Sequence, residues 1–216
     1  MRLQLVAVAG VAGLMTLPAT ADTLFDNGGP DGTNGYSVGT VNAFGARRTV
    51  LDDFVVPAGG WTINDFHWHS VWNSLPAGSG VGAELTLWSD AGGAPGAPMQ
   101  NMNITSYDEA GTGATFFSRP EAEHWVTFDS TALGAGTYWM EWTVVGPENN
   151  FVLTADANNG TNECWVNYDD LGGLMSGTDQ FGVAANMAFS ITGVPAPGAL
   201  ALLGLAGLAG SRRRRA

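Results

Sequence analysis

Seven short runs rich in Val, Ile, Thr and aromatic residues constrain the fold of this chain more than any other feature. They are residues 49–56, 61–72, 81–88, 123–128, 137–145, 163–168 and 181–191. Branched and aromatic side chains favour strands, and the Gly, Pro, Asn and Asp residues between the runs favour turns. This spacing predicts an all-β fold, a single antiparallel β-sandwich. Few helices are expected, because no segment keeps a 3.6-residue hydrophobic period.

The run 61–72 shows the two-residue alternation of a strand most clearly. One face carries Phe66, Trp68, Ser70 and Trp72, and the other carries Asp65, His67, His69 and Val71. Successive side chains of a strand point to opposite faces, so the aromatic set is expected on one side of a sheet.

The N-terminus has the layout of a secretory signal peptide. Arg2 is followed by an apolar region, residues 3–17, and by the small residues Ala19 and Ala21 in an A-x-A arrangement. This pattern predicts a signal helix over residues 1–21 and cleavage by signal peptidase after Ala21. The chain is therefore expected to be exported through the inner membrane.

The C-terminus, residues 194–216, has three parts with separate physical properties. Residues 198–210 contain only Gly, Ala and Leu, which suits a short apolar helix in lipid. The flanking residues are Val194, Pro195, Ala196 and Pro197 before it, and Arg212, Arg213, Arg214 and Arg215 after it. The prolines predict the end of a strand and an exposed elbow. The arginines are expected to stay on the cytoplasmic side during export.

A Pro motif, a small-residue apolar helix and a terminal arginine cluster together resemble the PEP-CTERM sorting signal of Gram-negative exosortase systems. The resemblance implies recognition by an exosortase-type sortase, cleavage near the Pro motif and delivery to the cell envelope or the extracellular space. Ala196 stands where the family name has Glu, which leaves the sortase subtype open. The apolar run has thirteen residues, short of the ~20 of a spanning helix, which suits a transient membrane association. A permanent C-terminal anchor is the alternative.

The body between the two signals, residues 22–193, is one domain with a strongly acidic balance. It holds all 20 acidic residues but only three arginines, Arg47, Arg48 and Arg119, which gives a net charge near −17. Phosphate binding needs clustered basic residues, so no nucleic acid is expected as a partner. Cations or neutral glycans fit this charge better. The single cysteine, Cys164, is expected to be a small buried side chain rather than a reactive thiol.

Three phrases of the body, residues 52–57, 87–96 and 133–139, resemble secreted bacterial β-sandwich domains of the jelly-roll kind. The resemblance implies a jelly-roll-like fold and an extracellular setting. It brings no catalytic residues with it.

Two kinds of metal site are candidates. Oxygen-bearing residues on a Gly-rich stretch could wrap a calcium ion, namely Asp26, Asn27, Asp31 and Asn34. Similar clusters follow at Asp156, Asn158, Asn159, Asn162 and Glu163, and at Asp169 and Asp170. The alternative is ordinary turn chemistry. His67 and His69 share a strand face and could bind a transition metal with His124, Asp65 or Glu123. The alternative is a solvated sheet face.

Eight tryptophans are enough to form a sugar-stacking platform, provided that two of them lie outside the core. The candidates are Trp61, Trp68, Trp72, Trp125, Trp139, Trp142 and Trp165. Trp68 and Trp72 share a strand face, whereas Trp139 and Trp142 point to opposite faces. Burial in the core is the alternative for each of them.

The sequence contains none of three common catalytic motifs, so it gives no support for an enzyme. The sequence has no G-x-S-x-G elbow, P-loop or H-E-x-x-H helix. The acid pairs Glu121/Glu123 and Asp52/Asp53 could serve a glycosidase only at a suitable separation in space. The sequence therefore predicts a non-enzymatic, exosortase-sorted surface or extracellular-matrix protein. The alternatives are a carbohydrate-binding module that binds an extracellular polysaccharide with or without calcium, and a secreted hydrolase.

Overall fold

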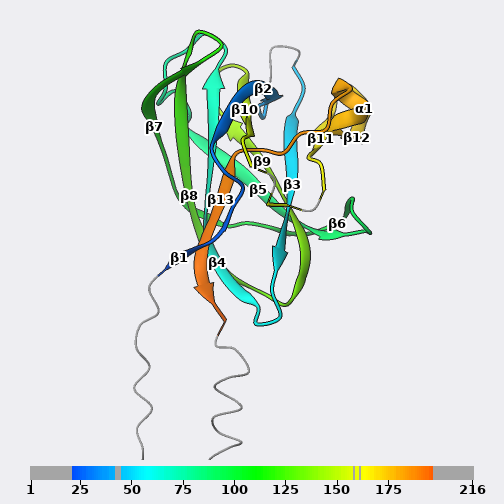
Figure 1. The fold of residues 1–216 in the computed structure, drawn as a ribbon. Helices are drawn as coiled ribbons and strands as arrows, with labels where there is room; N and C mark the ends of the chain where they lie inside the picture. Colours follow the sequence, from blue (N-terminus) through cyan, green and yellow to red (C-terminus); the bar gives the residue numbers. More distant parts are fainter. Residues whose placement is uncertain (1–20, 42–44, 158, 161, 197–216) are drawn as a thin grey trace, which may run out of the picture.

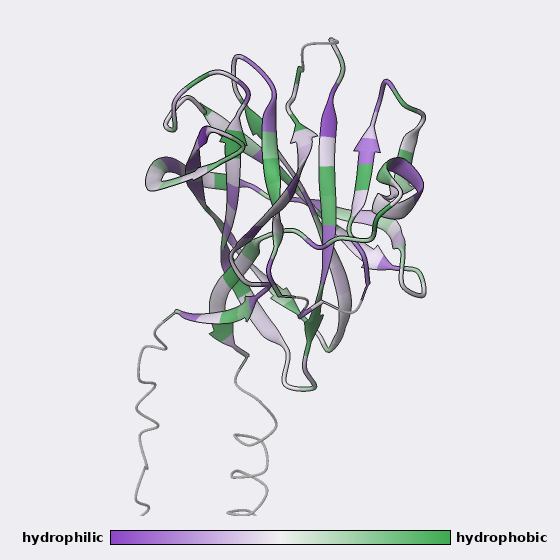
Figure 2. Ribbon diagram, turned by 45° about the horizontal axis from the view of Figure 1, so that its top comes forward, coloured by the Kyte–Doolittle hydropathy of each residue, from purple (hydrophilic) through white to green (hydrophobic). Residues whose placement is uncertain are grey.

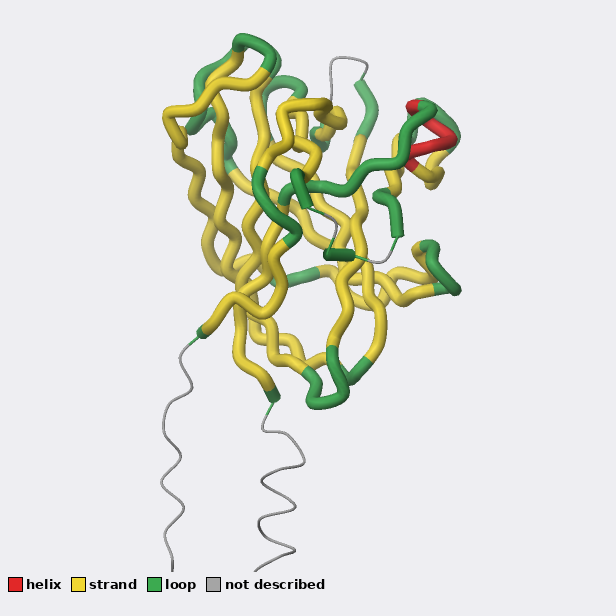
Figure 3. Tube along the Cα trace, in the orientation of Figure 1, coloured by secondary structure: helices red, strands yellow, loops and turns green. Residues whose placement is uncertain are grey.

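Two antiparallel sheets pack face to face in the computed structural model, which describes residues 21–41, 45–157, 159–160 and 162–196 (Figure 1). Strands account for most of this part of the chain (Figure 3). The all-β prediction and the sandwich are thus confirmed. The predicted signal helix and C-terminal apolar helix lie outside the described residues.

The larger sheet, here sheet A, is built around the long central strand β4. Its strands are β1 (Asp22–Asp26), β2 (Pro30–Val38), β4 (Trp61–Trp72), β7 (Ile104–Phe116), β8 (Arg119–Leu133), β10 (Asn150–Ala155) and β13 (Phe189–Pro195). On one side β4 pairs with β8, which pairs with β7. On the other side β4 pairs with β13 and β10, which in turn pair with β1 and β2.

The second sheet, sheet B, has the strand order β12-β11-β3-β9-β5-β6. Its strands are β3 (Arg48–Val56), β5 (Gly82–Asp90), β6 (Pro95–Asn101), β9 (Gly136–Val145), β11 (Trp165–Tyr168) and β12 (Gly173–Ser176). The short helix α1 (Gly177–Phe181) follows β12, and the Ser176 side chain caps it by accepting a hydrogen bond from the Asp179 amide.

The hydrophobic core lies between the inner faces of the two sheets. Phe66 and Phe189 of sheet A pack against Trp142 of sheet B, with ring centroids 5.0 and 5.5 Å away. Hydrophobic and hydrophilic stretches follow one another along the strands (Figure 2), as expected where one face of each strand meets the core. Burial of these aromatic side chains is the main favourable contribution to folding.

The alternation predicted for residues 61–72 is confirmed. Phe66, Trp68, Ser70 and Trp72 are buried on the inner face of β4, while His67 and His69 are partly exposed on its outer face. The prediction for residues 181–191 is wrong for residues 181–188, because β13 begins only at Phe189. There α1 ends at Phe181 and irregular chain follows, because Gly182 adopts the left-handed conformation that ends a helix.

Strands β1 and β13 lie side by side, so both ends of the described chain leave the sandwich at the same end (Figure 1). Asp22 is opposite Gly193. β13 continues past residue 193, with Pro195 opposite Trp61, and the Ala196 amide donates to the Gly60 carbonyl at 3.0 Å. The predicted elbow is therefore wrong for Val194 and Pro195, because these two residues belong to β13, and the strand ends at Pro195 within the Pro motif.

Within the described residues, no helix is both long enough and apolar enough to span a bilayer.

Candidate functional site

A buried carboxylate organises the outer face of sheet B. Along β9, Met140, Trp142 and Val144 enter the core, so Trp139, Glu141 and Thr143 point to the outer face. Glu141 is nevertheless only 3% exposed. A carboxylate with so little access to water needs hydrogen-bond donors from its surroundings.

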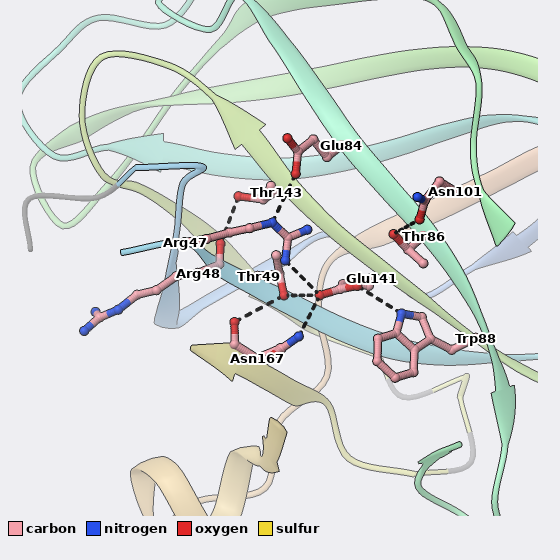
Figure 4. A network of polar contacts seen from close by, with 10 residues as sticks. All are labelled: Arg47, Arg48, Thr49, Glu84, Thr86, Trp88, Asn101, Glu141, Thr143 and Asn167. Carbon is pink, nitrogen blue, oxygen red and sulfur yellow. Dashed lines mark hydrogen bonds and ion pairs between the residues drawn. The ribbon is translucent and has the colours of Figure 1, made fainter. Parts of the chain in front are cut away.

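Four side chains donate to Glu141 from three strands and one loop (Figure 4). They are Thr49 Oγ1 at 2.6 Å, Trp88 Nε1 at 3.0 Å, Asn167 Nδ2 at 3.1 Å and Arg47 Nη1 at 3.4 Å. Because both carboxylate oxygens are used, the network fixes the orientation of the Trp88 ring and of the Arg47 guanidinium. We refer to these five residues as the Glu141 network.

Two further polar contacts lie near the Glu141 network, and the first of them is joined to it through Arg47 (Figure 4). Arg47 Nε donates to Glu84 at 3.1 Å, and Thr86 Oγ1 donates to Asn101 Oδ1 at 3.1 Å. Beside these groups lies a cleft of about 410 Å³ lined by Arg47, Ala83, Glu84, Leu85, Thr86, Asn101, Met102 and Ile104. Its volume is within the range of small-ligand pockets, ~300–1,000 Å³.

The glycan platform predicted at Trp68 and Trp72 is wrong. Their exposed fractions are 0% and 1%, because the inner face of β4 packs into the core between the sheets. Trp61, Trp139 and Trp142 are also buried. Trp139 and Trp142 do point to opposite faces, but Trp139 is covered near Asp90, whose carboxylate accepts from its Nε1 at 3.0 Å.

Three tryptophans remain partly exposed, Trp88, Trp125 and Trp165. Trp88 is absent from the candidates named from the sequence, although its position in β5 could have revealed it. Leu85 and Leu87 are buried on the inner face of β5, which places Thr86 and Trp88 on the outer face.

The predicted histidine pair lies on the outer face of sheet A. His69 Nδ1 is 2.7 Å from Glu121 Oε1, and His67 pairs with Asp65, with Glu123 3.9 Å away. His124 cannot join them, because it is fully buried and stacks on Trp68 at 4.6 Å, on the inner face. Among the described residues, no group of three His, Cys, Asp or Glu side chains is placed to hold a metal ion.

His124 is part of a hydrogen-bond chain inside the protein. Its Nε2 is 2.5 Å from Ser70 Oγ and its Nδ1 is 2.9 Å from the Tyr107 hydroxyl, which donates to Glu109 at 3.0 Å. Asn150 Nδ2 donates to Ser70 Oγ at 2.8 Å. The directions agree if neutral His124 accepts from Ser70 and donates to Tyr107. Ser70 is fully buried, so its hydroxyl is not accessible as a nucleophile. These hydrogen bonds therefore stabilise the fold.

The residues predicted to bind calcium make hydrogen bonds within the protein, some of them local and others to distant segments. Asp26 accepts from the Gly28 amide at 2.9 Å, and Asp31 accepts from Thr33 and Thr154 at 2.7 and 2.6 Å. The remaining contacts are Asn34 with the Gly35 amide, and buried Asn27 with Asp52, Met187 and Asn159. The contacts of Asp26, Asp31 and Asn34 with amides one or two residues away are typical of turns, whereas those with Thr154 and those of Asn27 join distant segments. The calcium site stays a prediction.

The two acid pairs differ in geometry. Asp52 and Asp53 are neighbours on β3 and point to opposite faces, with Asp52 accepting from the Met187 amide at 2.6 Å and Asp53 from Asn162 at 3.0 Å. Burial raises the pKa of Asp52 well above its usual range. Glu121 is buried and accepts from Thr112 and His69. Neither arrangement places two facing carboxylates across a cleft among the described residues.

Of the predicted processing residues, the structure describes Ala21, Val194, Pro195 and Ala196. Ala21 is exposed immediately before β1, and Ala19, Pro197 and Arg212 to Arg215 lie outside the described residues. Comparison with protein-family models, curated proteins and solved structures found no match for this chain.

Proposed function

We propose that this chain is a non-enzymatic surface or extracellular-matrix protein, exported by its N-terminal signal and sorted by an exosortase at its C-terminus. One observation supports the proposal most directly. The predicted signal cleavage site, Ala21, falls immediately before the first strand, and the Pro motif falls at the end of the last one. The jelly-roll-like topology is part of this proposal. The chain changes sheet at every connection except those between β1 and β2, β5 and β6, β7 and β8, and β11 and β12.

The pairing of β13 restricts where a sortase can cut. β13 is hydrogen bonded to β1 on one side and to β4 on the other, so a cut within it would remove the residues after the cut from the ladder with β4. A cut after Ala196 leaves both ladders complete. We therefore expect a mature C-terminus at Ala196 or beyond.

The test is expression of the full-length chain in an exosortase-positive Gram-negative host and in its exosortase-deletion strain. Mass spectrometry of the exported protein should show loss of the arginine cluster in the first strain only. Changing Arg212–Arg215 together to Gln should abolish this processing, whereas Arg119→Gln, which removes one arginine from the body, should leave it intact. Equal processing in both strains would refute exosortase sorting.

A second candidate function is binding of an extracellular polysaccharide. The observation in its favour is Trp88, a partly exposed indole held by a buried carboxylate beside a cleft. The test is titration of the purified full-length chain with soluble polysaccharides while Trp fluorescence is followed, with calcium and again with chelator. Binding that is lost in chelator would support the calcium-stabilised form of this candidate. The secreted hydrolase gains no support from the acid pairs.

A further inference from the structure

We propose that the outer face of sheet B binds a neutral oligosaccharide, with Trp88 as the stacking platform and the adjoining cleft as a subsite for sugar hydroxyls. This inference rests on the second candidate function and assigns it to particular residues.

Trp88 has the properties of a stacking platform. It is partly exposed, and its Nε1 donates to Glu141 at 3.0 Å, so the polar atom of the ring faces the protein. The exposed part of the ring is therefore apolar and accessible to a ligand. Indoles stack on the C–H faces of sugar rings, and a ring fixed before binding loses little conformational entropy when the ligand arrives.

The cleft lies next to this ring. Thr86 is two residues from Trp88 on the same face of β5, a separation of about 7 Å, and it lines the cleft. β6 pairs with β5 from Thr86 to Asp90, and the Met102 amide donates to the Leu85 carbonyl at 2.9 Å. The edge of β5 before Leu85 therefore borders the space where the chain crosses toward β7. A sugar stacked on Trp88 can therefore extend its neighbouring residue into the cleft.

The cleft lining suits hydroxyl groups. Thr86, Asn101, Glu84 and Arg47 supply a hydroxyl, an amide, a carboxylate and a guanidinium, so both donors and acceptors are present. Polar groups that fix ligand orientation beside an apolar surface are the usual composition of a small-molecule site.

Charge indicates a neutral ligand. Arg47, the arginine in the cleft, already contacts two carboxylates, Glu84 at 3.1 Å and Glu141 at 3.4 Å. The body carries 20 acidic residues against three arginines, so an anionic glycan would meet a repulsive field.

Trp125 provides a matched control. It is also partly exposed, but on the outer face of sheet A, where it lies edge-on to His67 with ring centroids 6.1 Å apart. Glu123 is on the same strand face, two residues away. Loss of this indole removes a surface tryptophan without touching sheet B.

The experiment is isothermal titration of the full-length chain with cellohexaose, xylohexaose, maltohexaose, mannohexaose and the anionic polygalacturonate. At least one neutral hexaose should bind, and polygalacturonate should not. Trp88→Ala should weaken binding at least tenfold, and exposed Asn101→Ala should weaken it about threefold or more. Trp125→Ala should change it less than twofold. Near-ultraviolet circular dichroism verifies that each variant is folded.

The outcomes separate the site from the function. If the wild type binds and neither Trp88→Ala nor Asn101→Ala weakens binding, the site is wrong while polysaccharide binding stands. If Trp88→Ala does not fold, the Asn101→Ala result decides. If no neutral hexaose binds the wild type, both proposals fall. If polygalacturonate is the preferred ligand, the neutral class is wrong.

Discussion

Protonation of the buried imidazole should make this protein lose stability in mild acid. Burial lowers the pKa of His124 from 6.5 to about 4, an effect opposed by Glu109 and reinforced by His69. In the unfolded chain the same group takes up its proton near pH 6.5. The unfolded state therefore binds more protons between pH 6.5 and pH 4, and the free energy of unfolding falls as the pH falls through this window.

The magnitude follows from the two pKa values. They differ by about 2.5, and each unit corresponds to about 1.4 kcal/mol, so the full loss below pH 4 is about 3 kcal/mol. Between pH 7 and pH 5 the loss is about 2 kcal/mol. The hydrogen-bond chain gives the reason: a protonated Nε2 can no longer accept from Ser70, and the imidazolium would be buried against Trp68.

The assay is urea unfolding of the wild type and of His124→Gln from pH 7.5 to pH 4.5. Other titrating groups contribute to both proteins, so the quantity to follow is the difference between their free energies of unfolding. It should be constant above pH 7 and shrink by about 2 kcal/mol by pH 5. His67→Gln, measured in parallel, controls for the loss of a surface imidazole. A difference that stays constant down to pH 5 would refute the reasoning.

Two further predictions concern single positions. The Cys164 thiol is fully buried, and burial raises its pKa well above the usual range. A disulfide reagent should therefore leave the native protein unlabelled and label one thiol per chain in guanidinium. Rapid labelling of the native protein would contradict this. Gly60 has φ +75°, and an added Cβ would lie 2.7 Å from the Leu133 carbonyl oxygen, so Gly60→Ala should cost about 2 kcal/mol or more. Gly134→Ala, which meets open space, should stay within about 0.5 kcal/mol by thermal unfolding, and equal effects at the two positions would contradict the steric account.

The sequence predicted those strands whose inner face is strongly apolar. The range 61–72 is that of β4, and 49–56 differs from β3 by one residue. Two of the strands that were missed, β6 and β7, lack this signal, whereas β10, which was also missed, has Val152 and Leu153 fully buried. β7 is mostly exposed and contains Gly111 and Gly113, and β6 contains two prolines, so neither shows the pattern of a half-buried strand. Their position is set by pairing with β8 and β5.

The candidate site was harder to predict than the fold. Tryptophan content indicated a platform, but a sequence does not show which face of a strand is covered. Trp139 points outward and is buried, whereas Trp88, directly opposite it on β5, is partly exposed. Glu141 gave no signal either, because its donors come from Thr49, Asn167, Trp88 and Arg47, which are far apart in sequence.

The pairing of β1 with β13 has a mechanical consequence. Because Asp22 and Gly193 are opposite each other, a force that pulls the two chain ends apart acts across the ladder and breaks its hydrogen bonds one after another. A strand pair pulled in this way separates at a lower force than a pair whose strands are pulled along their length, where all hydrogen bonds must break together. If the domain is attached through one chain end only and its partners pull on the faces of the sheets, this force does not act on the β1–β13 pair.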